Sequence, residues 1–157
     1  MRTRGLVVVV MVLAAASGLL GGCRARGVRV LADERLQRPI EEGLNLFEMR
    51  TGQRLRVTYA SPERIDVLLH TGSHDVLIVD LAQVDAQPVT SLFDRSSARA
   101  LGKTAGGVTL GCVMRRNAAK RRDVTALWRF LQEDEVGVVL RAAGVTPVGS
   151  GTGQMPR

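Results

Sequence analysis

The sequence predicts an α/β fold: a small, mostly parallel sheet flanked by helices, organised as a single lobe. Two observations between residues 28 and 80 predict it. Short apolar segments alternate with segments whose apolar residues recur three or four positions apart, as on one helix face. The last apolar run, Val76–Val79, is continuous, which is typical of a strand buried on both faces. Strands that alternate with helices favour parallel pairing.

These elements are justified in order by local signals. The predicted order is strand Val28–Ala32, a helix carrying Leu36, Ile40, Leu44 and Phe47, strand Leu55–Tyr59, a helix carrying Ile65, Leu68 and Leu69, and strand Val76–Val79. Gly52 is placed to end the first helix. Ser61 and Pro62 are a favourable N-cap and first helical residue for the second, which we expect to end at Gly72.

The carboxyl ends of these strands are the expected ligand edge. In parallel sheets, ligands bind beside the helix amino termini that follow the strands. The positions concerned are Asp33–Arg35, Ala60–Ser61 and Asp80.

The second half of the chain has weaker signals. Residues 81–106 are expected to be a connection with little regular structure, apart from one helical turn at Ala98–Leu101. The elements expected after it are strand Val108–Met114, a basic loop Arg115–Arg122, a helix with Asp123 as N-cap, and a helix from Asp134 that ends at Gly144. We expect one domain over residues 28–148 and a disordered tail over 149–157.

The amino-terminal segment is expected to be an export signal. Arg2 and Arg4 precede an apolar run too short to span a membrane comfortably, so residues 1–22 are interpreted as a signal peptide. The ending Leu20-Gly21-Gly22-Cys23 resembles a bacterial lipobox, which implies lipidation of Cys23, a tether over residues 23–27 and an extracytoplasmic, membrane-anchored protein. The alternative is an ordinary signal peptide or an uncleaved anchor.

Composition limits the partners. Hydrophobic residues make up 45% of the chain but aromatic residues only 3%, so the core is expected to be aliphatic. The net charge of +7 falls to +5 without Arg2 and Arg4, which favours anionic lipid or anionic solutes over nucleic acid. The basic loop 115–122 is interpreted as solvated, with contact to lipid headgroups as the alternative. Cys112 is expected to be a buried thiol.

No catalytic or cofactor signature is present. The sequence has no nucleophile elbow, phosphate loop or paired-carboxylate motif, so no catalytic residue, cofactor or enzyme activity is predicted. His70 and His74 are four residues apart, but Gly72 breaks the helix between them. A hard-cation site of Asp33, Glu34 and Asp80 is a weaker alternative, and no metal site is predicted.

The chain resembles the periplasmic molybdate-binding proteins of ABC importers, a family of solute receptors with two lobes. The segments that carry the resemblance are VRVLADERLQRPIEEGLNLFEMRTG (28–52), VTYASPERIDVLLHTGSHDVLIVD (57–80), residues 107–131 and FLQEDEVGVVLRAAGV (130–145). The resemblance rests on the order and spacing of these four segments. The family's second lobe lies between residue 80 and the return segment, where this chain has only residues 81–106, so we expect one lobe.

The resemblance implies a small oxyanion ligand and ABC importer membrane subunits as partners. The family holds its anion with hydroxyl groups and helix amides; the corresponding positions here are Arg35, Ser61 and Leu110, so one hydroxyl of three is kept. The expected anion site is therefore Ser61, Arg35 and Ala60. Ser61 has a plain N-cap as its alternative, worth about 1 kcal/mol, and Arg35 has pairing with Asp33 or Glu34. We expect a solute-binding lipoprotein with a degenerate site; the alternative is an interaction or structural lipoprotein without ligand capture.

Overall fold

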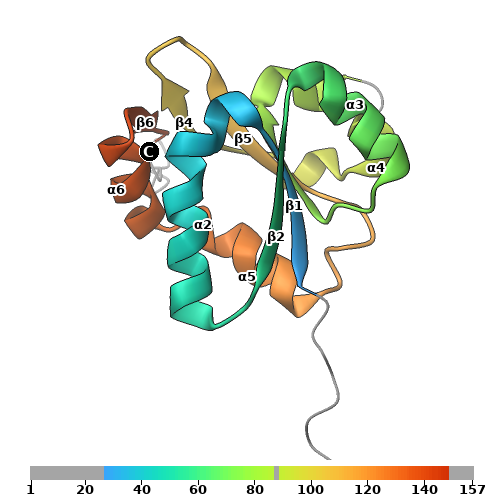
Figure 1. Ribbon diagram of the computed structural model, residues 1–157, viewed down its shortest axis with the longest axis horizontal. Coiled ribbons are helices and arrows are strands. Elements are labelled where there is room, and N and C mark those ends of the chain that lie inside the picture. The colour runs from blue at the N-terminus through green and yellow to red at the C-terminus, as the bar shows by residue number, and fades with distance from the viewer. Residues whose placement is uncertain (1–26, 87–88, 149–157) are drawn as a thin grey trace, which may run out of the picture.

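The computed structural model describes residues 27–86 and 89–148. The expectations for the signal segment 1–22, for Cys23 and for the tail 149–157 lie outside the described residues. Within the described ranges, a six-stranded sheet has the order β2-β1-β3-β5-β4-β6, and helices lie on both of its sides (Figure 1). The predicted α/β fold class is confirmed. No helix in these ranges has the length and apolar character needed to cross a membrane.

The elements follow one another along the chain in the order expected up to residue 80. The strands are β1 (Val28–Asp33), β2 (Leu55–Ala60), β3 (Val76–Asp80), β4 (Arg99–Thr104), β5 (Thr109–Met114) and β6 (Val145–Pro147). The α-helices are α2 (Gln37–Thr51), α3 (Pro62–Thr71), α4 (Val89–Leu92), α5 (Arg122–Phe130) and α6 (Asp134–Ala142). Short 3-10 helices are η1 (Glu34–Leu36), η2 (Leu81–Asp85) and η3 (Arg95–Ser97).

The local signals of the first half act as predicted. Gly52 ends α2 in the left-handed conformation, with φ 67°, which a side chain would disfavour. Ser61 holds the N-cap position of α3, and Pro62 is its first residue. The residues Val76–Val79 of β3 are buried throughout, whereas β2 alternates between half-buried and exposed residues.

The sheet is parallel in one half and antiparallel in the other. β1 lies between β2 and β3 and is parallel to both. The pairs β3–β5, β5–β4 and β4–β6 are antiparallel. A short turn joins β4 directly to β5, and such a connection permits only antiparallel pairing. The parallel arrangement predicted for residues 28–80 is therefore confirmed, and it does not extend to the rest of the sheet.

Three expectations for the second half are wrong. Residues 81–106 contain η2, α4, η3 and β4 instead of an irregular connection, and Ala98–Leu101 enters β4 instead of forming a helical turn. The helix after the basic loop begins at Arg122, with Arg121 at the N-cap position. Asp123 lies inside that helix, and its carboxylate pairs with Nη2 of Arg121 at 2.6 Å instead of capping the helix.

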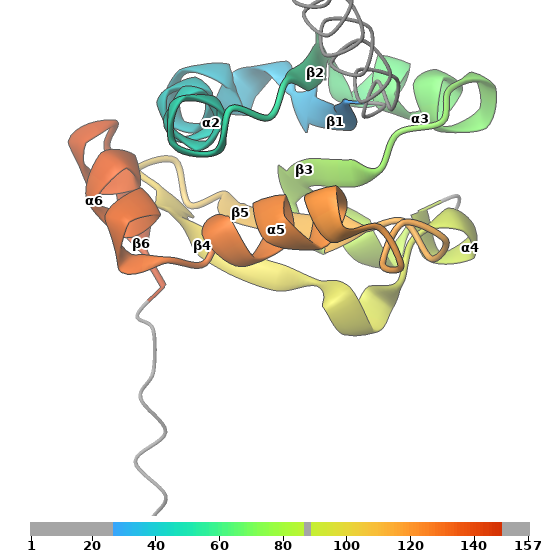
Figure 2. The same ribbon diagram turned by 90° about the horizontal axis from the view of Figure 1, so that it is seen from below.

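Two hydrophobic clusters occupy the two faces of the sheet. The larger lies under α2, α5 and α6 and contains Phe47, whose ring centroid lies 5.3 Å from that of Phe130, with Trp128 packed at its margin. The smaller lies under α3, η2 and α4. Figure 2 shows α5 along β5 and α6 beside β6. Phe47 therefore belongs to the larger core, and Trp128 packs against it.

Candidate functional site

The carboxyl ends of the three parallel strands meet at one edge of the sheet, as predicted. Asp33 at the end of β1 is in register with Ala60 at the end of β2. Asp80 ends β3, on the other side of β1. We call this edge the carboxyl edge; η1 begins beside it at Glu34 and α3 at Pro62.

Arg35 is committed to a carboxylate of its own chain. Asp33 is fully buried, and its Oδ2 accepts from Nη2 of Arg35 at 2.6 Å and from Nε at 3.1 Å. Its Oδ1 accepts from Nε at 3.0 Å and from the backbone amide of Arg35 at 2.9 Å. The hydrogen bonds and charge of Asp33 raise the pKa of Arg35. The guanidinium thus neutralises a buried carboxylate, which is one of the two expected alternatives for this residue.

Ser61 begins α3 through its backbone and not through its side chain. Its carbonyl oxygen accepts from the amides of Arg64 and Ile65, both at 3.0 Å, and its side chain makes no cap hydrogen bond. The hydroxyl lies near the carboxylate of Glu63. Hydrogen bonds from the amide of Glu63 itself and from Ser61 lower the pKa of Glu63. An anion at this helix start would compete with Glu63 for both donors.

Ala60 and Leu110 offer no polar side chain to a ligand. Ala60 is buried in the smaller hydrophobic cluster. Leu110, at the position of the family's tyrosine, is fully buried opposite Asp80 in the β3–β5 pair. Of the hydroxyl positions implied by the resemblance, Ser61 is the one that keeps an oxygen.

The electrostatics of the carboxyl edge disfavour an anion. Asp33, Asp80 and Glu63 all lie close enough to Arg35 to raise its pKa through their charges. Glu63 is the site residue that the sequence analysis missed. Its signal was present in the sequence, since an acidic residue in the first turn of a helix is drawn to the free amides there.

Arg35 and Ser61 do not line the same depression among the most pronounced ones on the described residues. Arg35 lines an open depression of about 560 Å³ along η1 and α2, which does not include Ser61. Glu63 lines a second depression of about 280 Å³ between α3 and η2, which includes neither Arg35 nor Ser61. The residues expected to form the anion site therefore lie on one edge of the sheet, and neither of these two depressions brings Arg35 and Ser61 together.

The described residues contain no group of three or more His, Cys, Asp or Glu side chains placed to hold a metal ion. His70 binds the carbonyl oxygen of Asp66 through Nδ1 at 2.8 Å, and His74 lies beyond the end of α3. Burial raises the pKa of the Cys112 thiol to about 12. Asp33, Glu34 and Asp80 share the carboxyl edge without forming such a group.

Comparison with solved structures identifies the fold. The substrate binding domain of a putative molybdenum ABC transporter from Clostridium difficile matches with a TM-score of 0.67 and 8% identity, over 78% of this chain and 99% of that chain. The Azotobacter vinelandii periplasmic molybdate-binding protein matches with a TM-score of 0.61 and 8% identity, over 83% and 100%. Peb3 from Campylobacter jejuni matches with a TM-score of 0.60 and 9% identity, over 76% and 99%.

The predicted resemblance to the molybdate-binding proteins is confirmed at the level of the fold. The mixed sheet with helices on both faces corresponds to a single lobe of a periplasmic-binding-protein-like fold. No family model matches the chain, and neither does any curated protein. Identities of 8% and 9% carry no information about individual ligand contacts.

Proposed function

We propose that this protein is an extracytoplasmic, lipid-anchored member of the solute-binding type whose oxyanion site is degenerate. The proposal takes its solute-binding part from the fold and its anchor from the Leu20–Cys23 sequence. It is a binding function and not a catalytic one. The alternative is an interaction or structural lipoprotein that retains the lobe without ligand capture.

One observation carries the degenerate site: the polar groups expected to hold an anion are already bound by carboxylates. Asp33 takes the guanidinium of Arg35 through bonds of 2.6 to 3.1 Å. The Ser61 hydroxyl lies close enough to the carboxylate of Glu63 to lower the pKa of that carboxyl. An oxyanion must displace a carboxylate at each position, and its own negative charge adds to theirs.

A single lobe weakens binding further. A receptor with two lobes surrounds its ligand and excludes water, so that each hydrogen bond acts in a low dielectric. Here the depression at Arg35 is open to solvent. Two or three hydrogen bonds of about 1–3 kcal/mol each total at most about 9 kcal/mol, and association costs at least about 4 kcal/mol of this, which leaves millimolar to high-micromolar binding at best. The similarity to receptors of ABC importers also suggests importer membrane subunits as partners, and we include them in the proposal.

Isothermal titration of the monomer with molybdate tests the ligand site. We expect weak heat that falls as ionic strength rises and disappears in Arg35→Ala. Arg129→Ala removes the same charge from an exposed position on α5 and is the matched control. Glu63→Gln should strengthen binding, because it removes the competing carboxylate and releases Ser61.

The outcomes separate the candidate functions. A submicromolar constant for the monomer would contradict the degenerate site and restore a transport receptor. Tight binding by a dimer alone would mean that a second chain supplies the missing lobe. No heat in the wild type or in Glu63→Gln would favour the interaction lipoprotein.

Metabolic labelling with a fatty acid tests the anchor separately. Cys23→Ser should abolish the label and release or misprocess the protein, because serine has no thiol to carry a diacylglycerol. Label that persists in the serine variant would exclude lipidation at Cys23.

A further inference from the structure

The opposite edge of the sheet is basic. The amino ends of β1, β2 and β3 meet there, because Val28 is in register with Leu55 and Val30 with Val76. The carboxyl end of β5 joins them, since Met114 pairs with Val76. We call this the amino edge; its basic residues are Arg29, Arg54, Arg115, Arg116, Lys120, Arg121 and Arg122.

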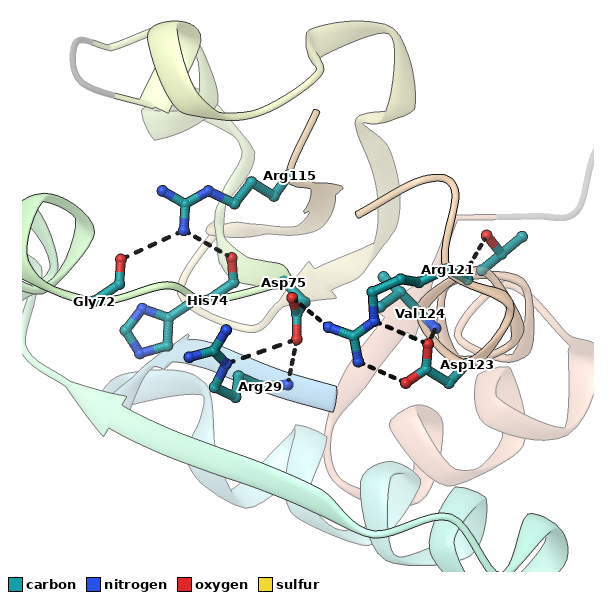
Figure 3. A network of polar contacts seen from close by, with 9 residues as sticks. Arg29, Gly72, His74, Asp75, Arg115, Arg121, Asp123 and Val124 are labelled. Atoms are coloured by element: carbon teal, nitrogen blue, oxygen red, sulfur yellow. Dashed lines mark hydrogen bonds and ion pairs between the residues drawn. The ribbon is translucent and has the colours of Figure 1, made fainter. Parts of the chain in front are cut away.

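A buried carboxylate organises the centre of this edge (Figure 3). Asp75 precedes β3, and its Oδ2 accepts from the backbone amide of Arg29 at 2.9 Å. Its Oδ1 pairs with Nη1 of Arg121 at 2.9 Å. Arg121 also pairs with Asp123. Asp75 and Asp123 thus fix two arginines at the ends of β1 and the basic loop.

The remaining cations keep their charge uncompensated by an ion pair. Arg115 donates through Nη1 to the carbonyl oxygens of Gly72 and His74, at 3.4 and 3.5 Å. Arg116 donates to the carbonyl oxygen of Thr90 at 2.7 Å, with Asp94 nearby. Among the described residues no carboxylate lies within ion-pair distance of the exposed Arg54, Lys120 or Arg122. Basic residues therefore outnumber carboxylates at this edge.

His74 lies within this positive surrounding. Burial is the main cause that lowers its pKa, and the charges of Arg29 and Arg115 lower it further. Its Nδ1 is buried and has no hydrogen-bond partner in the described structure. The half-buried ring between two arginines is thus held neutral, and it does not reduce the charge of the edge.

The chain enters the fold at this same edge. Residues 24–27 separate Cys23 from Val28, and a fully extended chain over that distance spans at most about 18 Å. A lipid on Cys23 would therefore hold the amino edge within about two Debye lengths of the membrane surface at physiological ionic strength. The basic residues and the tether therefore lie at the same edge of the sheet.

We propose that the amino edge docks on anionic phospholipid headgroups, so that the lobe stands on the membrane with its carboxyl edge facing away. The biological form of this contact rests on the lipid anchor of the proposed function. The contact itself depends on charge, so it is measurable without the anchor. The exposed Arg54, Lys120 and Arg122 supply charges without a carboxylate partner, and the Asp75 network holds Arg29 and Arg121 in place.

Vesicle flotation tests the contact. The protein is residues 23–157 with Cys23→Ser, which keeps every core residue and removes the lipid. We expect it to float with phosphatidylcholine vesicles that contain about one-third phosphatidylglycerol, and not with phosphatidylcholine alone. Binding should weaken as ionic strength rises from about 0.01 to 0.15 M, which shortens the Debye length from about 30 to 8 Å.

Two triple variants of equal charge decide whether the edge matters. Arg54→Gln, Lys120→Gln and Arg122→Gln together should lower the partition coefficient by about a hundredfold, at about fivefold per charge near an anionic surface. The control combines Arg38→Gln, Arg64→Gln and Lys103→Gln, which are exposed near the carboxyl edge. Circular dichroism checks that both variants keep the fold. Equal losses in the two variants, or no preference for anionic vesicles, would overturn the proposal.

Site-directed fluorescence gives a second measurement that leaves the charge unchanged. The Cys23→Ser chain keeps the native thiol of Cys112, which is fully buried. A cysteine introduced on the surface of this variant is therefore the thiol that a dye can reach. A dye on Asn117→Cys, in the basic loop, should be quenched by a headgroup-linked quencher in anionic vesicles. A dye on Ala105→Cys, in the turn between β4 and β5, should not. Equal quenching at both positions would refute the orientation.

Discussion

Replacement of Phe47 by alanine tests the packing of α2 on the sheet. The Phe47 side chain is 1% exposed, and its ring meets that of Phe130 on α5 at 5.3 Å between centroids. It also lies in the larger cluster together with residues of α6. The perturbation therefore removes a contact between α2 and α5, which are distant in sequence, within a cluster to which α6 also contributes.

The expected loss is about 3–5 kcal/mol in the free energy of unfolding. Two contributions add. The removed ring loses its transfer free energy, and the residual cavity loses contacts because the sheet beneath it cannot collapse. A domain of this size has about 5–15 kcal/mol of stability, so the variant should remain folded only marginally.

Urea unfolding followed by the fluorescence of the single tryptophan, Trp128, measures the loss. The midpoint should fall while the slope stays constant, since the surface exposed on unfolding changes little. Met49→Ala is the matched control: Met49 lies on the same helix but is 76% exposed, so its change should stay within about 0.5 kcal/mol. A loss below about 1 kcal/mol for Phe47→Ala would refute the assignment of this helix face to the core.

Three further changes probe the polar groups and the thiol. Asp75→Ala should lower the free energy of unfolding by about 1–3 kcal/mol, because the amide of Arg29 loses its acceptor. Urea unfolding measures this loss, with Asp66→Ala at an exposed position as the control. An equal loss in both variants would contradict the role of Asp75. Burial lowers the pKa of His74 below 6.5 in the folded protein, so the unfolded chain binds the proton first and stability should fall as the pH drops through that value. His74→Asn should flatten this fall, and His70→Asn is the control. If the pH profile of Tm is the same in His74→Asn as in the wild type, His74 does not cause the fall. With its pKa raised to about 12, Cys112 should react with a thiol reagent at pH 8 only on unfolding, and rapid labelling of the native Cys23→Ser chain would place the thiol elsewhere.

The first half of the fold was predictable because each of its elements has its own local signal. Gly52, the Ser61–Pro62 pair and the continuous apolar run of β3 mark boundaries and burial without reference to the rest of the chain. β4 has no such signal: Arg99 and Lys103 make it polar, and Gly102 interrupts it. Gly102 is needed because a Cβ there would lie 2.8 Å from the carbonyl oxygen of Thr146 in β6. That requirement exists only once the two strands are paired.

The candidate site was predictable in position but not in state. The strand order alone brings Asp33, Ala60 and Asp80 to one edge, and the adjacency of Asp33 and Arg35 anticipated their pairing. The burial of Asp33 depends on tertiary packing around the end of β1, and the position of Glu63 relative to Ser61 depends on the rotamers at a helix start. Neither follows from a pattern of residue types.

The strand order also has a consequence for how the protein is made. β3 lies in the middle of the sheet, but its second neighbour is β5, so Val76–Val79 stay without that partner until residue 114 has been synthesised. Helix α2 waits still longer for α6, against which it packs. An apolar strand with one open edge is prone to pair with other chains. We therefore expect the nascent chain to depend on a chaperone, and a truncation before residue 109 to aggregate instead of forming a smaller stable unit.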